Sequence, residues 1–126
     1  MRLSGVKHAA VYNRVTHVYR EGMSDDELSI ELEAIARRLG SLGLFRIFGS
    51  SMEIFMGSVL AGDNADEPSP YDFAMGGAGM NGSLPVGANG TILRPGMTVM
   101  VDLGGNFTGY MTDMTRVFVV RELTSD

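Results

Sequence analysis

The hydrophobic pattern of the chain changes at Gly40, and this change restricts the possible folds more than any other feature. Residues 24–40 have the periodicity of an amphipathic helix, with apolar residues on one side. Ser24 and Glu27 form a capping-box pattern at its start, and Gly40 is a typical helix stop. The apolar stripe consists of Leu28, Leu32, Ile35, Ala36 and Leu39. The sequence therefore predicts a helix over residues 24–40.

A second helix is predicted before it, over residues 5–20. Its apolar residues recur mostly at helical spacing, Ser4 could cap its start, and Gly22 follows its end. His8 and His17 both lie in this segment, about 180° apart around a helix, so they cannot chelate one metal together. We interpret both as surface or core residues.

After Gly40 the pattern is that of short strands. The segments LFRIF, MEIFM and GSVLAG are apolar and separated by glycines, and further strands are predicted from Met97 and from Tyr110 to Val120. Residues 62–96 are rich in Gly, Pro and Asn and are predicted to form a long loop region. Two helices followed by mostly antiparallel strands indicate the α+β class.

Composition excludes several classes of protein. The chain has 126 residues, which suits one domain, and a net charge of −5, which argues against nucleic-acid binding. It has no cysteine, so disulfides and thiolate metal sites are excluded. No apolar run approaches the roughly 20 residues that a membrane span needs, and no signal peptide is evident at the start. A cytoplasmic protein without membrane or nucleic-acid partners is expected.

Two aspartates stand out in the segment VDLGGNFTGYMTDMTRVF, which reads as a hairpin. Asn106–Gly109 fits a type I turn, and a hairpin centred there would pair Asp102 with Asp113 directly. Like charges so placed are destabilising unless they share a proton, meet a base such as Arg116, or bind a cation. From this pattern alone, turn residues or solvent-facing edge charges remain an equal alternative.

The same segment closely resembles the metal-binding hairpin of the pita-bread metallopeptidases, particularly the Xaa-Pro aminopeptidase, Xaa-Pro dipeptidase and creatinase branch. REGMSDDELSIELEAIARRLGSLG and RPGMTVMVD extend the resemblance upstream. It implies the first half of a pita-bread catalytic domain, so residues 1–126 would be a single partial domain. It also implies hydrolysis of a C–N bond at a centre of two divalent ions, manganese, cobalt or zinc. Asp102 would chelate one ion and Asp113 would bridge both, while a histidine and two glutamates would follow later in sequence.

One position departs from that family. A histidine that contacts the substrate carbonyl usually stands 17 residues before the first aspartate, and here that position is Pro85. Its role would be lost, adapted to another substrate, or taken by another residue, with Tyr71 and Asp72 as speculative substitutes. The catalytic residues are thus unknown, and a creatinase-like hydrolase or a silent member used for binding stays open. The substrate would be a small peptide or amide.

An uncovered sheet edge is expected if the chain is half of a pseudo-symmetric domain. The chain would then be inactive alone, because two carboxylates are too few to hold two metals. Such an edge invites pairing with another chain, so we expect a homodimer. The apolar face left open beside it would comprise Val99, Val101, Val117 and Val119.

Overall fold

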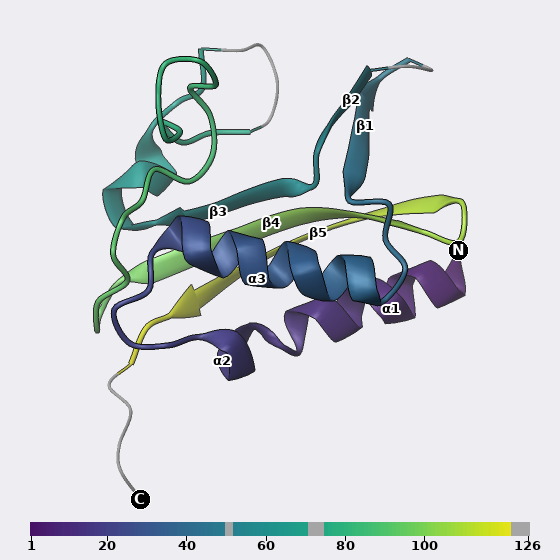
Figure 1. Ribbon diagram of the computed structural model, residues 1–126, viewed down its shortest axis with the longest axis horizontal. Coiled ribbons are helices and arrows are strands. Elements are labelled where there is room, and N and C mark those ends of the chain that lie inside the picture. The colour runs from purple at the N-terminus through teal and green to yellow at the C-terminus, as the bar shows by residue number, and fades with distance from the viewer. Residues whose placement is uncertain (50–51, 71–74, 122–126) are drawn as a thin grey trace, which may run out of the picture.

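The computed structural model describes residues 1–49, 52–70 and 75–121, and it has the predicted α+β organisation (Figure 1). The helices are α1 (Arg2–Tyr12), α2 (Val15–Val18), α3 (Asp25–Arg38) and a 3-10 helix, η1 (Gly62–Asp66). The strands are β1 (Leu44–Phe48), β2 (Met52–Phe55), β3 (Gly57–Ala61), β4 (Thr98–Phe107) and β5 (Tyr110–Val119). Within these ranges we find no helix long and apolar enough to cross a bilayer.

The strands form two antiparallel sheets. β1 and β2 make a two-stranded sheet, and β3, β4 and β5 make a three-stranded sheet in that order. Helices α1 and α3 run along one face of the three-stranded sheet, with α1 against β4 and β5 and α3 against β3 (Figure 1). The β1–β2 hairpin projects away from this layer (Figure 1). In the part of the chain that the structure describes, no α-helix covers the opposite face of this sheet, which we call the helix-free face (Figure 1).

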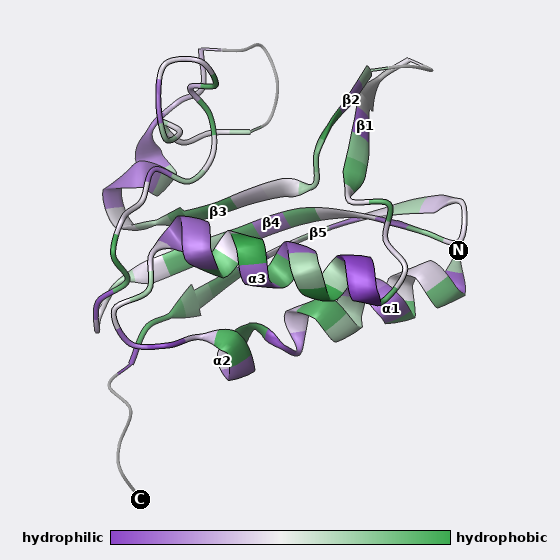
Figure 2. Ribbon diagram, in the orientation of Figure 1, coloured by the Kyte–Doolittle hydropathy of each residue, from purple (hydrophilic) through white to green (hydrophobic). Residues whose placement is uncertain are grey.

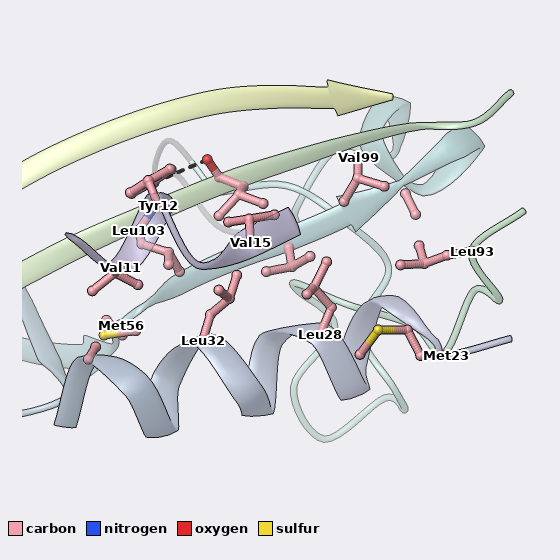
Figure 3. Close-up of a cluster of buried hydrophobic side chains, with 14 of the residues drawn as sticks. Val11, Tyr12, Val15, Met23, Leu28, Leu32, Met56, Leu93, Val99 and Leu103 are labelled. Carbon is pink, nitrogen blue, oxygen red and sulfur yellow. Dashed lines mark hydrogen bonds between the residues drawn. The ribbon is translucent and has the colours of Figure 1, made fainter. Parts of the chain in front are cut away.

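Helix α3 confirms the predicted cap and apolar stripe. Ser24 Oγ accepts a hydrogen bond from the Glu27 amide at 3.1 Å, and a Glu27 carboxylate oxygen accepts one from the Ser24 amide at 2.8 Å. Hydrophobic and hydrophilic residues alternate along the helix ribbon (Figure 2). Leu28 and Leu32 point toward the sheet (Figure 3), and Ala36 is buried as well. Burial of each leucine contributes about 2 kcal/mol of transfer free energy.

The first helix differs from the prediction. It begins at Arg2 and ends at Tyr12, and a separate four-residue helix, α2, follows it. The Arg14 amide bonds to the Val11 carbonyl three residues back, at 2.9 Å, so the chain tightens and the helix is interrupted. Ser4 is not a cap but a buried residue inside α1. A single helix over residues 5–20 capped by Ser4 was thus a wrong prediction.

Between β3 and β4, the described residues after η1 are mostly irregular, and buried polar side chains bind them to their surroundings. Asn64 donates to the Gly87 carbonyl at 3.1 Å and accepts from the Ala78 amide at 2.8 Å. At the other end, Asp25 accepts from the Gly90 amide at 2.9 Å. Both side chains are buried, so they attach this region to η1 and to the start of α3.

Candidate metal centre

The register of the β4–β5 hairpin differs from the predicted one. Asp102 pairs with Thr115, and Asp113 pairs with Gly104, so the two aspartates are not directly opposed. The turn contains two residues, Thr108 and Gly109, at φ 52° and 79°. Positive φ at both positions is typical of a type I′ turn, whose twist matches that of the flanking strands. A turn over Asn106–Gly109 would have shifted the pairing by two residues.

The two aspartates nevertheless lie on the same face of the hairpin. Directly paired residues share a face, and side chains alternate along a strand, so Asp102, Gly104, Asp113 and Thr115 all point to one side. Diagonal neighbours of this kind are roughly 7–8 Å apart. The neighbouring residues Val101 and Leu103 point the other way and are buried beneath the helices. Asp102 and Asp113 therefore lie on the helix-free face, half-buried and exposed respectively.

Hydroxyl groups flank Asp102 on both neighbouring strands. Thr115 Oγ1 donates a hydrogen bond to a carboxylate oxygen of Asp102. On the other side, Ser58 of β3 pairs with Asp102 in the ladder and so shares its face. The Ser58 hydroxyl is buried and has no hydrogen-bond partner among the described residues. One carboxylate oxygen of Asp102 is thus oriented by Thr115.

The glycines between the two aspartates make room for side chains on both faces. A Cβ atom on Gly104 would overlap the ring of Phe45, which comes from β1 and therefore lies over the helix-free face beside Asp113. A Cβ atom on Gly105 would overlap Thr112 and crowd His8 on the helix side. Phe45 thus forms an apolar wall of the candidate site, a feature that strand patterning could not reveal.

Two carboxylates on one accessible face could take part in binding a divalent metal, because such ions favour carboxylate oxygens. The described part of the chain has no cluster of three or more His, Cys, Asp or Glu residues that could hold an ion. The two histidines are a core and a surface residue, as interpreted from the sequence: His8 is buried on the helix side, and His17 is exposed on α2. The two aspartates would be part of a larger ligand set.

Pro85 has a backbone role in the loop. The Val86 amide bonds to the Leu84 carbonyl at 2.9 Å, which makes Pro85 the central residue of a γ-turn. The fixed φ of proline suits the common inverse form of this turn. The speculative substitutes Tyr71 and Asp72 lie outside the described residues.

The apolar face predicted to lie open beside the outer edge of the sheet is only partly exposed. β5 is the last strand in the sheet order, and Val117 and Val119 are exposed by 64% and 57%. Val99 and Val101 are buried at 2% and 0%, because they point toward the helices. The prediction that all four valines would lie open was therefore wrong for the two in β4.

Comparisons with known proteins give the family of the chain and proteins of similar fold. The sequence model of metallopeptidase family M24 matches residues 1–126. In fold, the chain is similar to an X-Pro aminopeptidase from Thermotoga maritima MSB8, with 20% identity and a TM-score of 0.61. It is also similar to an Xaa-Pro dipeptidase from Bacillus anthracis, with 24% identity and a TM-score of 0.63.

These structural matches cover 92% and 94% of this chain but 26% of each of the two solved chains. The chain thus spans about a quarter of the length of the solved structures that it matches. No curated protein matches the sequence at a significant level.

Proposed function

Because the chain belongs to metallopeptidase family M24, we propose that Asp102 and Asp113 are ligands of a divalent metal centre that hydrolyses C–N bonds. The observation that carries this proposal is their diagonal placement on the helix-free face of the β4–β5 hairpin. In that placement both carboxylates can approach one ion or a pair of ions. Without a bound cation, the two negative charges would destabilise the hairpin, because like charges on neighbouring strands repel each other.

The residues of the chain have distinct proposed roles at this centre. Asp102 and Asp113 would hold the divalent ions, and Thr115 donates a hydrogen bond that orients one carboxylate oxygen of Asp102. Manganese, cobalt and zinc all suit such a site. When bound, a two-metal centre activates water as a nucleophile and stabilises charge on the substrate carbonyl oxygen. Phe45 supplies an apolar surface above Gly104, the residue paired with Asp113.

The proposed substrate class is a small peptide or amide. The two solved structures are named as an X-Pro aminopeptidase and an Xaa-Pro dipeptidase, which supports peptides with proline after the first residue. Pro85 supports a second candidate function, because proline in a γ-turn cannot supply a proton to the carbonyl of a peptide substrate. That candidate is a hydrolase of a non-peptide substrate, as in creatinase, or a silent member that binds its ligand.

Manganese titration followed by NMR tests the metal site residue by residue. Mn²⁺ is paramagnetic, so we expect saturable broadening of backbone amides centred on residues 102 and 113. Asp102→Asn and Asp113→Asn should each remove this effect, while Asp63→Asn, at an exposed position in η1, should not. Broadening that is unchanged in both hairpin variants would show that the ligands lie elsewhere.

A further inference from the structure

Helix α1 is attached to the aspartate hairpin through polar side chains at a spacing of four residues. Ser4, His8 and Tyr12 occupy positions i, i+4 and i+8, which lie on one face of a helix, and all three are buried. Ser4 Oγ donates to the Phe107 carbonyl at 2.6 Å. His8 Nδ1 lies 2.8 Å from Thr112 Oγ1. We call these three residues the polar row of α1.

Tyr12 makes the most extensive of these contacts, and all of them are to backbone groups of residues adjacent in sequence to Asp102 or Asp113. The Tyr12 hydroxyl accepts a hydrogen bond from the Leu103 amide at 3.1 Å. It can donate to the Val101 carbonyl oxygen, 3.2 Å away, and to the Met114 carbonyl. Val101 and Leu103 are the two neighbours of Asp102 in sequence, and Met114 is the residue after Asp113. A single hydroxyl group thus joins the backbone on both sides of Asp102 to the backbone beside Asp113.

The position of the Tyr12 hydroxyl allows it to affect the spacing between β4 and β5. It lies on the helix side of the sheet, among the core residues around α1 (Figure 3). The aspartate side chains project from the opposite face, so Tyr12 touches neither carboxylate directly. It acts on the peptide groups from which the carboxylates project.

We propose that Tyr12, supported by the rest of the polar row, is a positioning residue that sets the separation of Asp102 and Asp113 for metal binding. This inference rests on the proposed function, because it assumes that the two aspartates bind a metal. Outer partners that orient metal ligands typically change affinity by 10–100-fold when they are removed. Since Tyr12 acts through backbone groups, we expect an effect at the lower end, a roughly 10-fold loss of Mn²⁺ affinity.

The test compares Tyr12→Phe with Tyr19→Phe in the Mn²⁺ titration by NMR. Tyr12→Phe removes the hydroxyl and keeps the ring. Tyr19 also packs against the core, but it lies beyond α2, near Val99 and Phe118 at the open end of the hairpin, so its variant is the matched control. Hydrogen exchange of the Leu103 amide is measured in parallel, because this amide loses its bond to the hydroxyl only in Tyr12→Phe. Thr112→Val, which removes the bond to His8, is a second and milder variant.

The expected result is faster exchange at Leu103 and a roughly 10-fold weaker Mn²⁺ affinity in Tyr12→Phe, with a smaller loss in Thr112→Val and none in Tyr19→Phe. If Tyr12→Phe does not fold, an unchanged affinity in Thr112→Val overturns the proposal. Unchanged affinity in Tyr12→Phe, while Asp102→Asn and Asp113→Asn abolish binding, also overturns it and leaves the metal site intact. Binding that survives both aspartate variants instead refutes the proposed function.

Discussion

Asp113 lies directly opposite Gly104 on the β4–β5 ladder, and the space that this glycine leaves is filled by the ring of Phe45. Phe45 thereby packs against the face that carries both aspartates, while the rest of the β1–β2 hairpin projects away from the sheet (Figure 1). The absence of one side chain thus determines what stands next to a candidate metal ligand.

Replacing Gly104 with alanine should destabilise the protein. The added methyl group would overlap the Phe45 ring, and overpacking of this kind costs about 1–3 kcal/mol. Urea denaturation of Gly104→Ala measures the cost. Gly82→Ala is the matched control, because a Cβ atom there meets nothing within 4 Å. Equal stability of the two variants would mean that Phe45 moves aside freely.

Replacing Thr108 with asparagine should stabilise the hairpin. Thr108 has a φ of 52°, which is costly for a β-branched residue, whereas asparagine followed by glycine is preferred in type I′ turns. The Ser4 hydroxyl keeps its bond to the Phe107 carbonyl after the change. We expect a gain of about 1 kcal/mol in unfolding free energy. A loss instead of a gain would indicate that the bond between Ser4 and Thr108 outweighs the backbone strain.

Stability should fall as the pH is lowered through the titration of His8. Burial lowers the pKa of His8, although the charge of Asp113 and the Leu103 backbone oppose this in part. The unfolded chain has the ordinary value near 6.5 and therefore takes up the proton first. The stability contributed by neutral His8 is fully present above about pH 6.5 and is lost as the pH falls through the lower folded value.

Denaturant midpoints between pH 5 and 8 test this prediction. The change of the midpoint with pH should be smaller in His8→Gln and should persist in His17→Gln, because His17 is exposed. Asp25 acts in the opposite sense: burial raises its pKa, so its contribution to stability grows as the pH falls through its folded value and is complete below the ordinary value near 3.8. If the midpoint changes equally with pH in both histidine variants, groups other than His8 determine the pH dependence of stability in this range.

Association through the β5 edge remains a prediction. Val117 and Val119 are exposed beside this edge, and an unpaired strand edge can pair with another chain. Light scattering coupled to gel filtration should show a homodimer, and Val117→Lys should shift it toward the monomer. Leu3→Lys, at an exposed position on α1, is the control. A monomer at high concentration, with no protection of β5 amides on concentration, would contradict the prediction.

Local signals in the sequence were sufficient for α3, for the strands and for the face that the aspartates share. The capping box of Ser24 and Glu27 requires only residues three apart, so it can be recognised without a tertiary contact. Side chains alternate along a strand with a period of two, and a register error of two residues leaves every side chain on its original face. For this reason Asp102 and Asp113 were predicted on one face although their pairing was wrong.

Only the tertiary structure decided the register of that hairpin and the role of α1. Thr108 adopts a positive φ that its own preferences disfavour, and Ser4, more than 100 positions away, lies 2.7 Å from its hydroxyl. Likewise, the hydrogen bonds of Tyr12 to β4 and β5 join residues about 90–100 positions apart. Such contacts leave no local pattern in the sequence. They form between residues that are distant along the chain and come together only when α1 packs against the β4–β5 hairpin.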